Sequence, residues 1–554
     1  MSMLSNSLLT GSAQKPTYRA VVFAGNGVDL FPLVEPSADL TSDEEDAPPP
    51  DIRSHGRGHG QTKALLPVAG RKMVDWVLDR VEEAGVVDIL VLTPLSICKP
   101  LAHHLRARRS QQVSAAGASN APHAHPTAKI ELEEIPEDVA GKGTVRVLMW
   151  AAEKGLISTD FILLPCDLLL SPASLNAPSI SLASLLDRHR TDDNLMTTLF
   201  SERAAGNVLA ARKDGPPEVL TIYDRESGTL LDLRELDEYD DDEVTLRTSL
   251  LAKYPAPTLA TSLLPTQLYI FSFLLLPVLR SPEHARRLKH MENVRELVGW
   301  VSRLAWRKGG QEALGAASAG KEEALAIGRS STQPAPSQSS RRQPAQAFEV
   351  HSLPQTGANT PALVSRASWR PEAGAMSPSF AAVTAGIVPA GSGGKKQSAA
   401  QARAGAGGCK VVVWREKDGF VARGNTVSGW VEINRAALRL LPPAPPATNT
   451  PSGVFISPDS LVHPSVLANV GEKVGVKRCI IGRNCSIGKG SKLTNCVIME
   501  SAVIGENVKL DNCVVSNGVQ IRDRAALKDC EIGRDVIVDA EAQLKGEQLV
   551  VEVD

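Results

Sequence analysis

The chain has 554 residues, more than one hydrophobic core usually holds, so its length predicts two or three domains. Its 60 basic and 62 acidic residues nearly cancel, and no overall field favours a nucleic acid or a membrane surface as partner. The most apolar run, residues 268–279, is too short to span a bilayer, and the first 16 residues lack the features of a secretory signal. With eight cysteines and no disulfide-like spacing, we expect a soluble protein of the cytosol.

The first ordered stretch combines a strand with a glycine turn. Residues 19–24 read as a short buried strand, Gly25 and Gly27 form the turn that leaves it, and a second ordered segment, residues 63–68, begins with Lys63. Glycines let a backbone approach a phosphate closely, and a lysine can neutralise the phosphate charge. Such a turn is more often only a tight connection between a strand and a helix, and both interpretations stay open.

The next segments continue an α/β pattern. Residues 73–81 are apolar at helical spacing, Gly85 predicts the end of that helix, and residues 87–92 read as the following strand. Residues 103–129, rich in Ala, Ser, Arg and His, lack a strong period and predict a surface insertion. The histidines of this insertion could bind a metal, but exposed loop histidines are usually inert, and we expect no metal site.

A second candidate motif lies before another strand. Gly143 and Thr144 precede a helical stretch, residues 145–154, and the strand that follows ends in Asp167. The glycine spacing does not fit the phosphate loop of nucleoside triphosphatases. A carboxylate at the carboxyl edge of a strand suits a hard cation such as Mg²⁺, but Asp167 could also simply cap the next segment.

The α/β domain is expected to span residues 18–308 and to end with a helix over residues 294–306. The acidic run at 237–243 is expected to be a solvated loop. Residues 309–408 are rich in Ala, Ser, Gly, Gln and Pro, and this composition predicts a disordered linker. Residues 409–453 then form a connecting segment that opens with a strand.

Residues 454–550 carry the strongest pattern in the chain, a repeat of 17 residues. Steps of six, six and five residues within each repeat predict three short faces per coil, that is, a left-handed parallel β-helix of hexapeptide repeats, with the cysteine and the two isoleucine and valine columns from Cys479 to Ile532 in its core. The repeating positions are Cys479, Cys496, Cys513 and Cys530; Ile481, Ile498, Val515, Ile532 and Leu549; Ile487, Ile504, Ile521 and Val538; and Leu493, Leu510, Leu527 and Leu544.

The repeat also predicts the role of its cysteines. Each cysteine stands two residues before an inward aliphatic, so alternation points its thiol inward, and stacked thiols lie in a line about 4.8 Å apart. A line of thiols cannot surround one zinc ion, so we expect buried small hydrophobic side chains and no metal. His463 near the first coil would be the candidate base of an acyltransferase, although a surface corner is the favoured interpretation.

The N-terminal motifs resemble the opening of the sugar-nucleotidyltransferases, which reads Gly-x-Gly-x-Arg-Leu-x-Pro-Leu and then Pro-Lys-x-x-x-Pro-Val. Residues 25–33 and 63–68 match that order and imply an α/β nucleotidyltransferase-like (Rossmann-like) domain. Three departures stand out. Asp29 replaces the arginine that grips the triphosphate, Thr62 replaces a proline, and residues 35–61 are an insertion. An anion in place of that cation repels a polyanionic substrate.

The resemblance also implies roles for the second motif. In that family a Gly-Thr pair before a helix helps to hold the base, and an aspartate after the next strand binds magnesium, which points to Gly143, Thr144 and Asp167. A second metal-binding acid is expected later, but the corresponding stretch, residues 263–269, contains none. We therefore expect a vestigial nucleotide pocket with no catalytic residue, metal or cofactor. Its residues are Gly25, Gly27, Asp29, Lys63, Gly143, Thr144 and Asp167.

The order of the two domains resembles both nucleotide-sugar pyrophosphorylases and two subunits of eukaryotic translation initiation factor 2B. Residues 422–426, 432–435 and 492–499 resemble the gamma-subunit family of that factor. In the epsilon family, guanine-nucleotide exchange resides in a domain after the β-helix, and here the chain stops soon after Leu549, which favours gamma.

The resemblance implies a non-catalytic regulatory and assembly subunit of a guanine-nucleotide exchange complex. Its expected partners are the epsilon, alpha, beta and delta subunits of initiation factor 2B. With them it would help to bind initiation factor 2 and promote GDP release and GTP loading. No membrane or direct nucleic-acid site is expected. The alternative is a nucleotide-sugar pyrophosphorylase similar to mannose-1-phosphate guanylyltransferase, which would need magnesium, Lys63 and Asp167 to act despite Asp29.

Overall fold

The computed structural model describes the two folded parts of the chain and the segment that joins them. The described residues are 18–34, 62–118, 128–171, 180–202, 219–236, 244–310, 312, 408–415, 418–441 and 452–551. The insertion at 35–61, the acidic run at 237–243 and nearly all of the linker at 309–408 lie outside these residues, so the expectations for them stay predictions.

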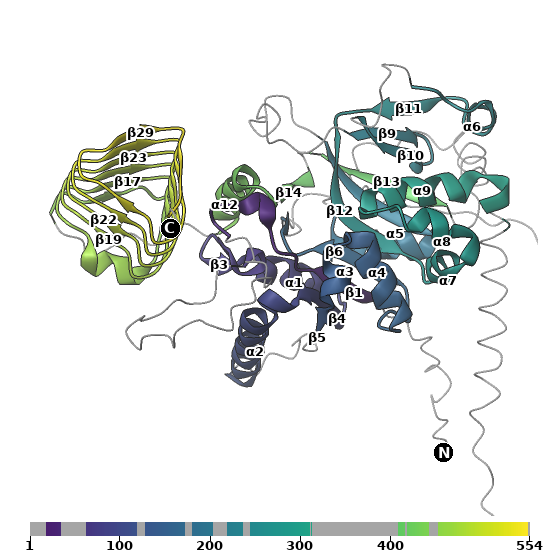
Figure 1. Ribbon diagram of the computed structural model, residues 1–554, viewed down its shortest axis with the longest axis horizontal. Helices are drawn as coiled ribbons and strands as arrows, with labels where there is room; N and C mark the ends of the chain where they lie inside the picture. Colours follow the sequence, from purple (N-terminus) through teal and green to yellow (C-terminus); the bar gives the residue numbers. More distant parts are fainter. Residues whose placement is uncertain are drawn as a thin grey trace, which may run out of the picture.

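The N-terminal domain is built on one mixed ten-stranded sheet (Figure 1). The strand order is β11-β9-β10-β13-β8-β12-β6-β1-β4-β5, with parallel pairing from β6 through β1 and β4 to β5. The strands are β1 Arg19–Phe23, β4 Asp88–Pro94, β5 Lys129–Ile135, β6 Phe161–Pro165, β8 Met196–Glu202, β9 Val219–Asp224, β10 Thr229–Glu235, β11 Pro257–Ala260, β12 Leu263–Phe271 and β13 Cys409–Trp414. Small two-stranded pairs are formed by β2 Pro67–Val68 with β3 Arg71–Lys72, and by β7 Leu168–Leu170 with β14 Val421–Arg423.

Helices cover both faces of this sheet because consecutive strand residues point to opposite sides. Val21 of β1 packs with residues of α4, α7 and α9, whereas the next residue, Val22, packs with residues of α1, α2 and α5. The helices are α1 Met73–Glu83, α2 Leu95–Ala118, α3 Glu137–Ala140, α4 Thr144–Glu153, α5 Leu182–Thr191, α6 Thr248–Lys253, α7 Leu275–Arg280, α8 Pro282–Leu288, α9 Val294–Trp306 and α12 Val427–Leu440, with 3-10 turns η1 Val28–Leu30, η2 Lys63–Leu65 and η6 Pro464–Asn469. Among the described residues, none of these helices has the length and apolar character that a membrane crossing requires.

The stretch at 103–129 differs from the expected irregular insertion. Residues 103–118 continue α2, and only residues 119–127 lie outside the described part of the chain. The helix is held to α1 by charge: the Arg108 guanidinium lies 2.8 Å from an Asp79 oxygen and 2.9 Å from a Glu82 oxygen. His104 Nε2 lies 3.0 Å from Asp75 Oδ1, so it is paired with a structural carboxylate. Alanine and arginine favour helices, but the mixed composition hid the period.

The strand at the start of the connecting segment belongs to the N-terminal domain. β13 runs parallel to β8 over six residue pairs, Cys409↔Met196 to Trp414↔Ser201, and also pairs with β10. It therefore lies inside the sheet, between two strands that come before the linker. Cys409 and Trp414 are buried there. The N-terminal domain therefore does not end at residue 308 as expected. Its sheet is completed by β13, which follows residues 309–408 in the sequence.

The C-terminal domain is the predicted left-handed β-helix, with three parallel sheets that stack coil on coil (Figure 1). Strands one coil apart pair in a register of 17 residues, for example Ile487↔Ile504 and Ile504↔Ile521. The three sheets are β15 Phe455–Ile456, β17 Gly475–Lys477, β20 Lys492–Thr494, β23 Lys509–Asp511, β26 Ala526–Lys528 and β29 Gln543–Lys545; β16 Leu461–Val462, β18 Ile480–Ile481, β21 Val497–Ile498, β24 Val514–Val515, β27 Glu531–Ile532 and β30 Gln548–Leu549; and β19 Ser486–Ile487, β22 Val503–Ile504, β25 Gln520–Ile521 and β28 Ile537–Val538.

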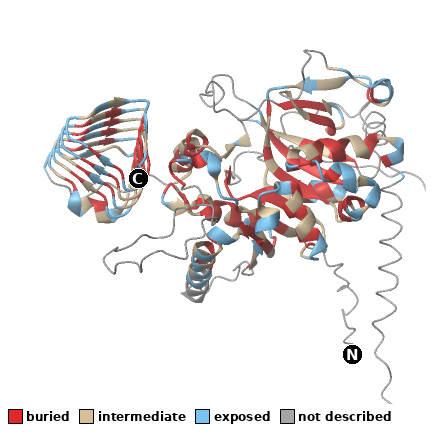
Figure 2. Ribbon diagram, in the orientation of Figure 1, coloured by how far each residue is buried: buried red, intermediate tan, exposed pale blue. Residues whose placement is uncertain are grey.

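The predicted core residues of the β-helix point inward (Figure 2). Each has no more than 2% of its surface exposed: Cys479, Ile481, Ile487, Cys496, Ile498, Ile504, Cys513, Val515, Ile521, Cys530 and Ile532. The four repeating thiols also bond locally, since each Sγ lies 3.1 to 3.3 Å from the carbonyl oxygen two residues earlier. They act as small core side chains.

The corners of the coils show a second 17-residue pattern that the sequence analysis did not use. Arg478, Asn495, Asn512 and Asp529 repeat at one corner with φ of 51°, 54°, 55° and 53°. This left-handed conformation turns the chain sharply between faces, and asparagine and aspartate tolerate it better than most side chains. Core columns and corners thus repeat together and fix the register of the coils.

We predict that Ile504→Asp destabilises the β-helix by about 3 kcal/mol or more, because the new carboxylate would lie unpaired among aliphatic side chains. Thermal and urea unfolding of the full chain would measure the loss. The matched control is Val503→Asp in the same strand, since Val503 points outward with 46% of its surface exposed. Equal stability of the two variants would contradict the inward register.

Candidate functional site

The candidate site is centred on Asp167, whose carboxylate is fully buried and held by two cations. Asp167 Oδ2 lies 2.6 Å from Lys63 Nζ. Arg423 grips the same carboxylate with both ends of its guanidinium, Nε to Oδ1 at 3.0 Å and Nη2 to Oδ2 at 2.9 Å. The Lys63 and Arg423 side chains are 12% and 17% exposed. We call these three residues the Asp167 triad.

Three distant segments bring the triad together. Asp167 follows β6, which leaves it beyond the carboxyl end of a strand in the centre of the sheet, as the sequence analysis expected. Lys63 opens the turn η2. Arg423 ends β14, which pairs antiparallel with β7 so that Arg423 stands opposite Leu168. The backbone supports this pairing, because Gly424 N donates to Asp167 O at 2.9 Å.

The charge state of Asp167 follows from its surroundings. Burial alone would raise the pKa of this carboxyl, but the charges of Arg423 and Lys63, and the hydrogen bonds that they donate, outweigh burial and hold the pKa far below its usual range. The neighbouring Cys166 thiol shows the opposite balance, since burial raises its pKa to about 12. Asp167 is therefore an anion at neutral pH, and Cys166 is a neutral thiol.

The triad leaves little for a metal or a phosphate to bind. Both oxygens of Asp167 already accept charged hydrogen bonds, and a metal would have to displace a cation from each. Lys63, the residue expected to meet a phosphate, is bound to the same carboxylate. No cluster of His, Cys, Asp and Glu with the geometry of a metal site occurs among the described residues.

The stretch in which the sequence analysis found no second metal-binding acid, residues 263–269, is β12, whose Tyr269 pairs with Leu163 in the sheet. The side chain that faces Asp167 belongs to Arg423, in a segment that had been assigned to a connector. No spacing rule links residues 167 and 423, so the sequence analysis missed Arg423 as a site residue.

The glycine turn packs against the triad but holds no ligand-like arrangement. Gly27 has φ of 79°, and a Cβ added to it would lie 2.8 Å from Lys63 Cβ, so glycine is required for this close approach. Gly25 and Asp29 are exposed, and Asp29 forms no ion pair with any described residue. The structure therefore brings together Gly27, Lys63 and Asp167 from the predicted pocket.

Gly143 and Thr144 are used elsewhere in the domain. A Cβ on Gly143 would lie 2.4 Å from the carbonyl oxygen of Glu292. Thr144 Oγ1 accepts a hydrogen bond from Val294 N at 3.1 Å, and Val145 N donates to Glu292 O at 3.1 Å. The pair thus fastens the start of α4 to the start of α9. These contacts of Gly143 and Thr144 do not reach the triad.

The segment after the glycine turn contacts the β-helix. Leu30 and Leu33 are buried in a cluster that joins the N-terminal domain, α12 and one outer face of the β-helix, including Trp430 and Val497. Gln548 Nε2 donates to Phe31 O at 3.1 Å. The loop that would face phosphates in the resembling family therefore forms part of the contact between the domains.

Helix α12 lies between the two domains and bonds to both. Its Asn434 side chain accepts from Ala69 N at 2.9 Å, and Arg435 donates to the Asn512 side chain of the β-helix at 2.7 Å. The β-helix histidine, His463, accepts a hydrogen bond from Ser465 N through Nδ1 at 3.2 Å and caps η6. This local capping role supports the interpretation of His463 as a surface corner.

The comparison with protein families supports this interpretation of the C-terminal domain. Residues 453–544 match the family model described as the EIF2B subunit epsilon LbH domain, that is, the left-handed β-helix domain of the epsilon subunit of translation initiation factor 2B. The match covers the β-helix and supports a protein related to that factor. The matched model is that of epsilon, whereas the sequence repeats resemble gamma, so the type of subunit belongs to the proposal below.

We predict that Arg423→Ala lowers the free energy of unfolding by about 3 kcal/mol, because it leaves Asp167 buried with one of its two cations missing. Urea unfolding of the full chain would measure this. Arg415→Ala is the matched control, since Arg415 is half exposed and 3.5 Å from the Glu202 carboxylate, and its loss should cost at most about 1 kcal/mol. A similar small effect at both positions would contradict the structural role of the triad.

The low pKa of Asp167 also predicts a pH dependence. A carboxyl whose pKa is lower in the folded than in the unfolded chain stabilises the folded protein at pH values above the pKa of the unfolded state, about 3.9. This stabilisation is lost progressively as the pH falls below that value. Asp167→Asn should therefore be much less stable than the native chain at pH 7, with the difference shrinking between about pH 4 and pH 3. Urea unfolding at several pH values would measure it. A difference that does not change with pH would contradict the assigned charge state.

Proposed function

Because its β-helix relates this chain to translation initiation factor 2B, we propose that the protein is a non-catalytic regulatory and assembly subunit of that guanine-nucleotide exchange complex. The observation that carries the proposal is the match of residues 453–544. In this proposal the chain is of the gamma type and pairs with an epsilon subunit, in a complex with the alpha, beta and delta subunits. There, in the cytosol, it helps to bind initiation factor 2 and to promote GDP release and GTP loading.

The absence of catalysis in this proposal rests on the Asp167 triad. A pyrophosphorylase needs a free carboxylate for magnesium and a free cation for the substrate phosphates. Here Asp167 and Lys63 neutralise each other at 2.6 Å, and Arg423 adds a second cation on the same carboxylate. Asp29 adds an exposed negative charge on the turn where the resembling enzymes carry an arginine. No cofactor is part of the proposal.

The gamma assignment rests on local resemblance. Residues 422–426 and 432–435, which resemble the stretch before the β-helix in gamma subunits, form the end of β14 and part of α12. They carry Arg423, which binds Asp167, and Asn434 and Arg435, which join the domains. A stretch that both neutralises the pocket and fixes the β-helix suits a subunit with an assembly role.

The proposal predicts which chains accompany this protein. The tagged full chain, purified gently from its source cells, should recover the other four subunits of initiation factor 2B in fixed ratio, together with initiation factor 2 in smaller amount. Mass spectrometry of the eluted complex would identify them. Ile504→Asp should lose the epsilon subunit, because it damages the β-helix that we propose as the epsilon interface.

Two outcomes would contradict the proposal. One is a purified chain that recovers none of these subunits. The other is synthesis of nucleotide sugar from a sugar phosphate, a nucleoside triphosphate and magnesium at ordinary enzyme rates, roughly 1 to 1000 per second, which would support the pyrophosphorylase alternative. Removing one well-placed electrostatic stabiliser typically costs about 100- to 1000-fold in rate, so we expect any turnover to lie at least about 100-fold below that of an active enzyme.

A further inference from the structure

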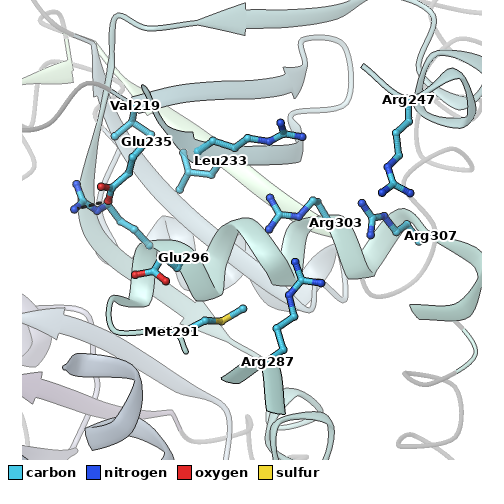
Figure 3. Close-up of a pocket in the computed structure, with 11 residues that line it drawn as sticks. Val219, Leu233, Glu235, Arg247, Arg287, Met291, Glu296, Arg303 and Arg307 are labelled. Carbon is cyan, nitrogen blue, oxygen red and sulfur yellow. Dashed lines mark ion pairs between the residues drawn. The ribbon is translucent and has the colours of Figure 1, made fainter. Parts of the chain in front are cut away.

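A second concave site lies in the N-terminal domain, formed by the end of β10, the start of α6, and α8 and α9. Its volume is about 500 Å³, and it shares no residue with the Asp167 triad. Arginines dominate its lining (Figure 3). We call it the arginine pocket, after Arg234, Arg247, Arg287, Arg295, Arg303 and Arg307.

The acidic residues around the arginine pocket neutralise only part of this charge. Asp232 is shared by Arg234, at 2.7 Å, and Arg303. Glu235 pairs with Arg295 at 2.6 Å.

The remaining acid on the lining is committed to its own helix. The Glu296 carboxylate accepts a hydrogen bond from Asn293 N at 3.1 Å and completes the cap of α9. Three acids therefore face six arginines, and formal charges leave the described pocket with an excess of three positive charges.

Three of the arginines have no acidic partner in the described part of the chain: Arg247, Arg287 and Arg307. Figure 3 shows the guanidinium groups of Arg247 and Arg307 directed toward each other, with Arg287 pointing toward α9 from below. Burial, followed by the charge of Arg247 and of the other arginines, lowers the pKa of Arg307. The cations therefore lie close enough to repel one another.

Such a cluster costs stability unless an anion enters it. Guanidinium groups match phosphate geometry with two parallel hydrogen bonds and are weakly hydrated, which suits them to phosphate better than lysines. Val219, Leu233 and Met291 also line the pocket, but all three are buried, so the accessible lining is mainly the arginine side chains. The volume of the pocket falls within the range of small-molecule sites, about 300 to 1000 Å³.

We propose that the arginine pocket binds a phosphorylated small molecule that carries at least two phosphate groups. Arg247, Arg287 and Arg307 hold the phosphates. Nucleoside polyphosphates, sugar bisphosphates and inorganic polyphosphate share this chemistry. The site is separate from the Asp167 triad, so this proposal stands independently of the proposed function.

Calorimetric titration of the purified full chain with inorganic tripolyphosphate tests the proposal. We expect saturable binding of one equivalent, and at least tenfold weaker binding to the double variant Arg287→Ala, Arg307→Ala. Arg286→Ala is the matched control: it removes the same charge from the same helix, but Arg286 does not line the pocket, and binding should stay within twofold. Arg287 is exposed, so the single variant Arg287→Ala replaces the double variant if the latter does not fold.

Parallel titrations with a nucleoside triphosphate and with a hexose bisphosphate identify the source of the phosphates. If the nucleoside triphosphate or the hexose bisphosphate binds tenfold more tightly than tripolyphosphate, the ligand belongs to the class of the tighter probe. If all three bind equally, the ligand is a polyphosphate. All three outcomes support the site, provided that the arginine variants weaken binding.

Three results would overturn the proposal. The first is no saturable binding of any of the three probes. The second is binding that survives in the arginine variants or is lost instead in Lys63→Ala. The third concerns the acidic run at 237–243, which lies between Glu235 and Arg247 in the sequence. If tripolyphosphate binds only after Asp240, Asp241 and Asp242 have been changed to Asn, the counter-ion of the pocket is this chain's own acidic run, and no external phosphate is its ligand.

Discussion

The burial of Asp167 is the constraint on which the N-terminal domain depends. A carboxylate with no exposed surface is tolerated only when cations pair with it, and the two cations come from residues 63 and 423. Arg423 reaches it only because β13 first enters the sheet between β10 and β8. The residues that follow 309–408 therefore complete the N-terminal domain in two ways. They supply β13 to its sheet, and they supply Arg423, the second cation that neutralises Asp167.

The same ion pairs explain why the loops around the pocket can contact the β-helix. Lys63 packs against Gly27, and the turn that follows sends Leu30 and Leu33 into the cluster shared with α12 and the β-helix. In the resembling enzymes such a turn is expected to face a ligand. Here internal contacts on both sides, with Lys63 and with the β-helix, hold the turn.

The sequence predicted the β-helix well because every coil obeys the same local rule. Ile487, Ile504 and Ile521 are each inward because alternation and the 17-residue register apply to all of them. The triad obeys no such rule, since 256 residues separate Asp167 from Arg423. Chain order was the only guide, and it led to residues 263–269, which are a strand of the sheet. The helical residues 103–118 were hidden for another reason: their mixed composition shows no clear period, and several of their contacts with α1 are ion pairs, as at Arg108.

A fold can keep the architecture of an enzyme while its charges are rearranged. The glycine turn, Lys63 and Asp167 lie close together, and Arg423 closes them into an ion-pair network. Such a network needs no ligand to order it, so the surfaces built on it are preorganised. Preorganised surfaces favour stable association with other chains, and this supports the proposal that the domain serves assembly.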